Sequence, residues 1–264
     1  MDFIRLDMNQ FRIFLLVLIR CSVILAILPL FGSRNWPMLI KAGLILLMAV
    51  LLFPGIRIQA QSWPLPQTAF DHALLALTEV MIALCLGMCI NLILAGIQTG
   101  AQLVGFQMGF GLVNVLDPQS GTQLSVMAQV AFLIAMLFFL NLDGHHWFIL
   151  ALADSFDKVR PGSIVLSPGL FQLIIDLGAE LFIVAIKVVA PAIAVLLCIH
   201  ASMGIIAKSV PQIHVFLLSF PVTISAGLFF FGLSLTLLAQ YMDGFVNTGL
   251  GVLLGRALRE LGGG

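Results

Sequence analysis

The sequence predicts an all-α integral membrane protein of packed helical hairpins, with about six apolar helical segments and an irregular central loop. Three observations indicate this fold class. The 264 residues are 61% hydrophobic and only 9% charged, whereas soluble domains carry about 25% charged residues. Apolar runs recur along the chain, and no Lys or Arg occurs between Arg57 and Lys158. The formal net charge of zero gives no sign of nucleic-acid binding.

The first two apolar segments, residues 21–33 and 42–56, are short. As a helix, residues 42–56 would cover about 22 Å, while the hydrocarbon core of a bilayer is about 30 Å thick. Proline and glycine close both segments, the second at Pro54-Gly55. We expect these segments to form a helical hairpin that packs against other protein.

Four longer segments follow, each close to the length of about 20 apolar residues that crosses a bilayer. They are residues 80–98, 124–142, 188–207 and 215–239. The main connectors are residues 59–67, 154–168 and 203–212. Lys and Arg are more numerous on the side of the two termini than on the opposite side, which predicts cytoplasmic termini by the positive-inside rule.

A glycine-rich stretch, residues 105–121, interrupts this pattern. It has too many glycines for a stable helix and too few charges for a solvated loop. Irregular backbone at membrane depth persists only where protein buries it or where it lines a cavity. We therefore expect the stretch to lie inside a pathway. Just before it, Gly96 and Gly100 match the small-xxx-small pattern of closely packed helices.

Several charged residues lie inside or beside apolar segments, where a charge at the bilayer centre costs about 2.5–3.5 kcal/mol. One hypothesis makes Glu79 or Asp176 a proton carrier; the other pairs them with Arg20, Lys187 or a partner subunit. Pairing is favoured, because no second carboxylate aligns with Glu79 to form a relay. The candidates for inter-helix or inter-subunit charge pairing are Arg20, Glu79, Asp176, Glu180, Lys187 and Lys208.

No catalytic, cofactor or metal site is predicted. The chain contains no Walker motif, nucleophile elbow or dinucleotide fingerprint. His145 and His146 are adjacent, and neighbouring helical side chains point about 100° apart, which argues against a shared metal ion. Cys85 and Cys89 share a helix face but lack further ligands at a suitable spacing. We therefore expect a protein that is not an enzyme.

A series of motifs runs through most of the chain, from about residue 12 to 240. They are Arg20, Pro29, Pro37, Glu79, Gly87, Gly105-Phe-Gln-Met-Gly-Phe110, Asp117-Pro-Gln-Ser-Gly121, Leu142-Asp-Gly-His-His-Trp147, Ala190-Pro191 and Pro211-Gln-Ile-His-Val-Phe-Leu-Leu-Ser-Phe-Pro221. In order and spacing they resemble the FliR family, the membrane export-gate subunits of flagellar and virulence type III secretion. The two glycine motifs are more typical of the flagellar branch. His214, Ser219 and Thr223 depart from the family pattern, which bears on local contacts of that segment.

The resemblance implies a single membrane domain without cofactors in the bacterial inner membrane. Residues 1–165 would form a FliP-like part and residues 170–264 a FliQ-like helical hairpin. Its implied partners are FliP-like and FliQ-like subunits in a gate, an FlhB-like subunit, unfolded export substrates and membrane lipid. The assembled gate would belong to the flagellar basal body and be raised toward the periplasm.

The resemblance also implies that residues 105–121 are a plug that closes the export channel. Phe106, Met108 and Phe110 would supply apolar bulk around Gly109, and an apolar constriction can gate by dewetting. The plug would end at two further residues, Asp117 and Pro118, where the Asp side chain can cap the backbone.

A second hypothesis is a membrane transporter for small solutes or ions, with a midplane site at Glu79 and the glycine-rich stretch. Secondary transporters usually carry internal repeats with broken helices in both halves. The glycine-rich interruption occurs once in this chain, so the export gate is favoured.

Overall fold

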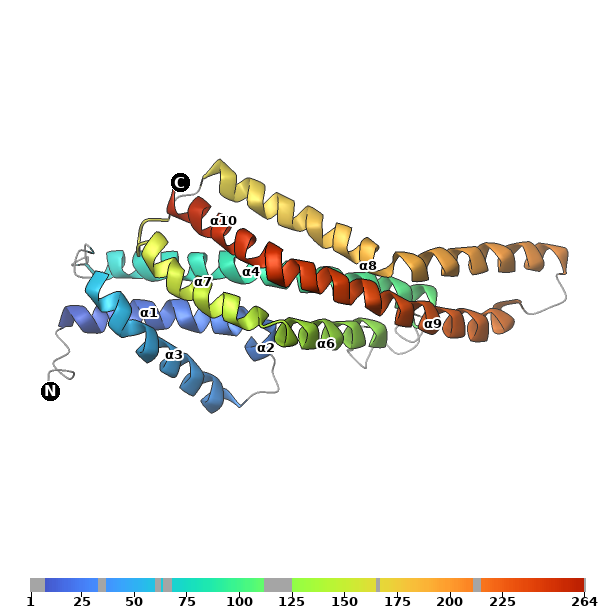
Figure 1. The fold of residues 1–264 in the computed structure, drawn as a ribbon, viewed down its shortest axis with the longest axis horizontal. Coiled ribbons are helices and arrows are strands. Elements are labelled where there is room, and N and C mark those ends of the chain that lie inside the picture. The colour runs from blue at the N-terminus through green and yellow to red at the C-terminus, as the bar shows by residue number, and fades with distance from the viewer. Residues whose placement is uncertain are drawn as a thin grey trace. The chain divides into compact units, whose positions relative to one another are not determined.

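The computed structural model describes residues 8–32, 37–59, 63, 68–111, 125–164, 167–210 and 215–263. All regular structure in these ranges is helical, which confirms the predicted all-α fold class (Figure 1). The elements are α1 (Met8–Ile27), α2 (Pro29–Gly32), α3 (Met38–Gln59), α4 (Ala69–Gln107), α6 (Val126–Asn141), α7 (Gly144–Lys158), α8 (Pro168–Ser209), α9 (Val215–Gly244), a π-helical turn (Phe245–Gly249) and α10 (Leu250–Gly262).

The described helices have the length and hydropathy of membrane spans. Five helical stretches are long and apolar enough to cross a membrane, and the bent pair α6–α7 makes a sixth if it counts as one broken span. Their mean hydropathy lies between 2.0 and 2.7 for the five single stretches. The expectation of about six apolar helical segments in an integral membrane protein is confirmed.

α4 is much longer than the apolar run that predicted it. Residues 80–98 supply the hydropathy, but the helix begins at Ala69 and ends at Gln107. The Asp71 amide donates to the Thr68 hydroxyl at 3.2 Å, and this hydroxyl donates to the Asp71 carboxylate at 2.5 Å. The arrangement is similar to a capping box, which satisfies amide groups at the start of a helix. The helix therefore starts at a polar signal that lies outside the apolar run.

Three prolines of the described helices lie inside them and do not end them. The predicted end at Pro54 is wrong, because α3 continues to Gln59. α8 and α9 likewise contain Pro191 and Pro221. A proline leaves one backbone carbonyl of a membrane helix without its amide partner, and neighbouring helices or small local adjustments can satisfy that carbonyl. Proline is therefore a weaker stop signal in this chain than in a soluble protein.

The chain packs as two compact units. The first unit contains Met1–Asn91, Asp143–Asp176 and Thr248–Gly264, and the second contains Leu92–Leu142 and Leu177–Asn247. α4 and α8 contribute residues to both units.

In the first unit, α1 packs against α2 and α3, and α7 packs against α3 and α10 (Figure 1). α1 and α3 thus form the predicted helical hairpin, but the expectation that both segments are short is wrong. α1 begins at Met8 and includes Arg20, α3 begins at Met38, and both are long and apolar enough to cross a membrane. The core of this unit includes the buried side chains of Val17, Cys21, Phe148, Phe156 and Leu258. These contacts bring residues from both ends of the sequence into one core.

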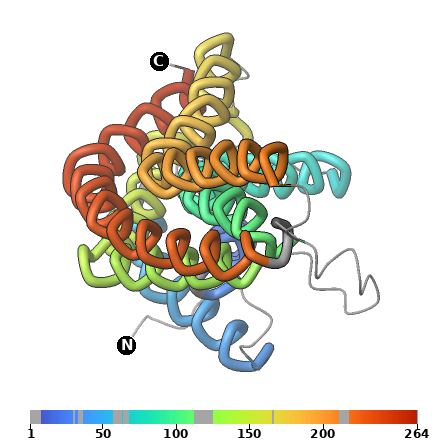
Figure 2. The backbone as a smooth tube through the Cα atoms, turned by 90° about the vertical axis from the view of Figure 1, so that its right-hand side faces the viewer, coloured from blue at the N-terminus to red at the C-terminus, as the bar shows by residue number. Residues whose placement is uncertain are grey.

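In the second unit, the end of α4 (green in Figure 2) lies among α6, α8 and α9. A Cβ at Gly96 would lie 2.6 Å from the Leu181 carbonyl oxygen, and a Cβ at Gly100 would overlap the Ala185 carbonyl. Two glycines on α4 therefore let its backbone approach the backbone of α8, as the small-xxx-small spacing predicts.

The same unit contains a hairpin of α8 and α9, and α6 packs against α9 (Figures 1 and 2). The turn expected at residues 203–212 starts later, because α8 continues to Ser209. Ser202 and Ser209 each donate a hydroxyl hydrogen bond to the backbone carbonyl four residues earlier. These bonds satisfy both hydroxyls within the helix, so Ser202 lies inside α8 without breaking it, and Ser209 is its last residue.

Replacing Gly100 with Leu should push α4 away from α8, because overpacking a close contact costs about 1–3 kcal/mol. We expect the thermal midpoint of the purified protein in detergent to fall by about 5 °C. Gly204→Leu on α8 is the matched control, since no atom lies within 4 Å of a Cβ at that position. Equal midpoints for the two variants would contradict the close backbone approach.

Candidate functional site

Arg20 on α1 and Glu79 on α4 form a buried, bidentate ion pair in the first unit. The guanidinium Nε donates to Glu79 Oε2 at 2.5 Å, and Nη2 donates to Oε1 at 3.0 Å. Both side chains are 0% exposed. The structure therefore joins two of the six charged residues that the sequence proposes for pairing.

The C-terminal half of α7 and the residue that follows it complete the surroundings of Arg20. Nη1 donates to the Ser155 hydroxyl at 2.9 Å, and Nη2 also donates to the Val159 carbonyl at 3.2 Å. The Phe156 ring centroid lies 4.2 Å from the Arg20 Cζ atom, a cation–π distance. The sequence does not single out these three residues, because a serine and a phenylalanine in a helix acquire this role only through contact with a distant segment.

This network links three helices through charge. An ionised side chain in an apolar interior is strongly destabilising unless it is paired and hydrogen-bonded. Removing one partner of a buried pair costs about 3–5 kcal/mol, because the other charge is left uncompensated. The folded positions of α1, α4 and α7 within the first unit therefore depend on one another.

Other charged candidates lie nearer the surface. Asp176 accepts hydrogen bonds from Arg256 Nη1 at 3.1 Å and from Gln172 Nε2 at 2.8 Å. The Arg256 and Asp176 side chains are 41% and 44% exposed, and exposed pairs contribute about 0–1 kcal/mol. Glu180 accepts a hydrogen bond from the Tyr241 hydroxyl at 3.3 Å. Arg256 and Tyr241 are absent from the predicted set, since each meets its partner from a distant helix.

Lys187 and Lys208 are exposed, and neither has an ion-pair partner among the residues that the structure describes. Lys208 lies in the last turn of α8, whereas Lys187 lies near its middle. Exposed Phe182, Ile183 and Ile186 are close to Lys187 in sequence. An ammonium group on an apolar face of a membrane helix is unfavourable against lipid. Lys187 therefore marks a face that requires a polar partner or water.

The glycine-rich stretch begins as helix and then turns. α4 continues past Gly105, so irregular backbone begins later than predicted. The Gly109 amide then donates to the Phe106 carbonyl at 3.0 Å, and the Phe110 amide donates to the Gly105 carbonyl at 3.0 Å. Gly109 has φ +93°, a left-handed conformation that commonly ends helices. Glycine is required at this turn by its backbone conformation.

The Met108 side chain packs against α9 and holds this turn there. This side chain is fully buried, and a Cβ at Gly227 would lie 2.5 Å from Met108 Cγ and 2.7 Å from Sδ. A Cβ at Gly109 would lie 2.5 Å from Cε1 of the Phe220 ring. The absence of a side chain at Gly227 thus leaves the space that Met108 fills. Residues 108–109, which we call the anchored turn, are held on the second helix of the α8–α9 hairpin.

The remaining plug candidates are less enclosed. Phe106 is 47% exposed, and Phe110 is half-buried. The Phe106 ring leaves no room for a Cβ at Gly111. Asp117 and Pro118 lie outside the described residues. The structure therefore describes residues 105–111 of the stretch that the sequence predicts to be a plug.

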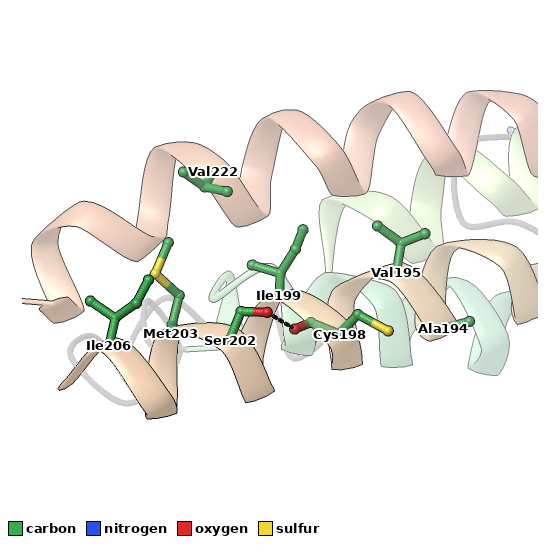
Figure 3. Close-up of a pocket in the computed structure, with 8 residues that line it drawn as sticks. All are labelled: Ala194, Val195, Cys198, Ile199, Ser202, Met203, Ile206 and Val222. Carbon is green, nitrogen blue, oxygen red and sulfur yellow. Dashed lines mark hydrogen bonds between the residues drawn. The ribbon is translucent and has the colours of Figure 1, made fainter. Parts of the chain in front are cut away.

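An apolar groove of about 390 Å³ lies between α8 and α9 (Figure 3). Its lining residues are Ala194, Val195, Cys198, Ile199, Ser202, Met203, Ile206 and Val222. The Ser202 hydroxyl donates to the Cys198 carbonyl at 2.8 Å, which satisfies its hydrogen (Figure 3). Such a groove suits lipid chains or another apolar helix better than a polar substrate.

A cluster of possible metal ligands occurs at the start of α7. Asp143, His145 and His146 each place one ligand atom within 4.8 Å of those of the other two. The ring centroids of the two histidines are 4.3 Å apart. The sequence predicts that His145 and His146 point apart, but the structure brings their rings together, because rotation about side-chain bonds can turn neighbouring rings toward each other.

Comparison with known proteins identifies a matching family. The bacterial export proteins, family 1, match residues 11–249. This range includes the buried Arg20–Glu79 pair, the anchored turn and the α8–α9 hairpin.

Individual relatives match the chain over most of its length. A flagellar biosynthetic protein FliR of Bacillus subtilis (strain 168) is 32% identical over 220 residues, 82% of this chain and 83% of the relative. The FliR protein of Escherichia coli (strain K12) is 25% identical over 226 residues, 86% and 85% of the two chains. The FliR protein of Aquifex aeolicus (strain VF5) is 27% identical over 219 residues, 81% and 82% of the two chains.

A double-mutant cycle tests the buried network. Arg20→Met and Glu79→Leu should each lower the free energy of unfolding in detergent by about 3–5 kcal/mol, because each leaves one buried charge unpaired. The double variant should lose much less than the sum of the two single losses, since it leaves no unpaired charge.

The control cycle uses Asp176→Asn and Arg256→Gln, whose partly exposed pair should contribute about 0–1 kcal/mol. Additive losses in the Arg20–Glu79 cycle, measured by denaturant unfolding, would show that the pair is not coupled in the folded protein.

Proposed function

This chain belongs to the family of bacterial export proteins, family 1, and we propose that it is a core, non-catalytic subunit of the flagellar type III protein export gate. Its relatives are flagellar biosynthetic proteins. In this proposal it assembles with FliP-like and FliQ-like subunits, and an FlhB-like subunit binds the gate. Unfolded export substrates pass through the resulting channel in the inner membrane at the flagellar basal body.

The anchored turn is the observation that carries the gating part of the proposal. A plug needs a mobile apolar portion and a fixed base, and Met108 in the space at Gly227 provides such a base. The left-handed Gly109 redirects the chain immediately after α4. Residues 105–121 are therefore proposed as the plug, with Phe106 and Phe110 as its apolar bulk and Asp117 and Pro118 at its end.

The surface of α8 supports assembly with other subunits. Lys187 lies exposed on an apolar helix that is long enough to cross a membrane. A carboxylate on a neighbouring subunit would compensate this charge within the membrane. The apolar groove between α8 and α9 offers a surface for a helix of such a subunit. We propose that residues 170–264 form the FliQ-like part of the chain and residues 1–165 the FliP-like part.

A solute transporter with Glu79 at its binding site has less support. Both carboxylate oxygens of Glu79 accept hydrogen bonds from Arg20, and the side chain is 0% exposed. A carboxylate that carries ions or protons must exchange with water or substrate. The closed Arg20–Glu79 pair therefore favours a structural role for Glu79.

Filling the space at Gly227 should release the plug. Gly227→Leu removes the position that Met108 occupies, so cells that assemble the variant gate should leak small solutes across the inner membrane. The measurement is uptake of a small membrane-impermeant dye by the cytoplasm of cells that lack the natural subunit and express the variant.

Gly232→Leu is the matched control on the same helix, because no atom lies within 4 Å of a Cβ at Gly232. Both variants must reach the membrane at equal levels. Equal dye uptake for the two variants would overturn the role of the anchored turn as the base of a seal.

Neutralising Lys187 should weaken assembly. Lys187→Gln leaves the proposed carboxylate of the neighbouring subunit without its counter-ion, so the yield of complex that co-purifies with FliP-like and FliQ-like subunits should fall severalfold. Lys208→Gln, at the end of the same helix, is the control and should keep the full yield. Identical yields for the two variants would argue against a charged contact at Lys187.

A further inference from the structure

The break between α6 and α7 contains an unusual backbone position. Asp143 has φ +56°, and it is the sole residue other than glycine with positive φ in the part of the chain that the structure describes. Left-handed backbone in a residue with a Cβ is unfavourable and is often found at functional sites. Asp143 and the α7 residues next to it belong to the first unit.

The Asp143 carboxylate is not used for capping. Asp143 is the N-cap residue of α7, where a carboxylate usually accepts a hydrogen bond from an amide of the first turn. Its side chain makes no such capping bond. Instead, Asp143 Oδ1 lies 3.2 Å from Nδ1 of His146. The carboxylate is therefore directed toward an imidazole. Carboxylate oxygens and imidazole nitrogens are both common ligands of transition metals in proteins.

A buried nitrogen of His145 lacks a hydrogen-bond partner in the described part of the chain, which is a second and independent observation at this cluster. The His145 Nδ1 atom is buried and has no hydrogen-bond partner among the described residues. The ring also lines a cavity of about 90 Å³, and every other residue lining that cavity is apolar, as Ile24, Leu28 and Leu152 illustrate. A buried polar nitrogen normally has a partner. The cavity does not provide one.

One of the ligand-to-ligand distances matches that of a metal site. Two ligand atoms, each about 2.05 Å from a tetrahedral Zn²⁺, lie about 3.3 Å apart. The Asp143 Oδ1 to His146 Nδ1 distance is 3.2 Å. The three ligand atoms of Asp143, His145 and His146 lie within 4.8 Å of one another. Binding of an ion would require the third atom, on His145, to move closer by rotation of its imidazole about the side-chain bonds.

We propose that Asp143, His145 and His146 bind one divalent transition-metal ion, with Zn²⁺ as the best match. Two imidazoles and one carboxylate suit Zn²⁺, whereas Ca²⁺ and Mg²⁺ prefer oxygen ligands alone. Three protein ligands leave a fourth position for water or for a group from a partner. The ion satisfies a ring that otherwise lacks a partner and holds Asp143 in its left-handed conformation.

Such an ion would stabilise the start of the helix that completes the buried network. α7 begins at Gly144, and Ser155 and Phe156 near its other end contact Arg20. Fixing the first turn of α7 therefore supports the positions of Ser155 and Phe156. Binding of the ion should raise the thermal stability of the chain as well as occupy the site.

The test uses the full chain, purified in detergent and stripped of metal with a chelator. Isothermal titration with Zn²⁺ should show one saturable site per chain, and Zn²⁺ should raise the thermal midpoint. His146→Gln should weaken binding at least tenfold and abolish the midpoint shift. The His146 side chain is 69% exposed, so this substitution leaves the fold intact. Asp143→Asn and His145→Gln should give the same loss.

His200→Gln is the matched control, because His200 is an exposed histidine on α8, away from the cluster in sequence. It should bind Zn²⁺ as the unchanged protein does. Replacing Zn²⁺ with Co²⁺ adds a direct readout, since tetrahedral Co²⁺ absorbs visible light and the band should vanish in His146→Gln. Absence of saturable binding, or equal binding by His146→Gln and His200→Gln, would overturn the proposal.

Discussion

The need to compensate one buried guanidinium organises the first unit. Arg20 has no access to water, so each of its nitrogen atoms must find an acceptor within the protein. Glu79 supplies the countercharge, and Ser155 and Val159 supply the remaining oxygen acceptors. Apolar contacts hold helices together by shape and are not directional. The bidentate pair and the hydrogen bonds to Ser155 and Val159 are directional, so they define the register of α1, α4 and α7 more sharply.

The second unit solves its packing by a different principle. Lipid offers helices no hydrophobic reason to associate, so close van der Waals contact must provide the attraction. Gly96 and Gly100 bring the backbones of α4 and α8 together, and Gly227 leaves space for Met108 on α9. The backbone or a large side chain of one helix thus packs against a glycine of another helix. The anchored turn follows from the same arrangement, since it continues α4 just past these glycines.

The sequence predicted the fold class well, because hydropathy is a local property that composition reveals. It also indicated Arg20 and Glu79, since a charge is conspicuous in an apolar run. It could not indicate Ser155, Phe156 or Val159, whose role depends on contact with residues distant in the chain. The start of α4 was missed because polar capping at Thr68 lies outside the apolar run. The end of α3 was missed because the helix continues through Pro54. The contact that holds the start of the proposed plug could not be predicted either, because it depends on Gly227, and nothing in the sequence relates this glycine to Met108.

Met108 in the space at Gly227 also sets an energy scale. Withdrawing one methionine side chain from an apolar site costs about 1.5–3 kcal/mol, so the turn would spend roughly 0.6–7% of its time detached at equilibrium. Thermal motion alone reaches such a state many times without a nucleotide or a covalent change. In the proposed gate, an export substrate that displaces residues 105–121 would need to shift this equilibrium only slightly. In the proposed gate, the Met108 contact would therefore be weak enough to open reversibly, and it would form again without an energy source after the substrate has passed.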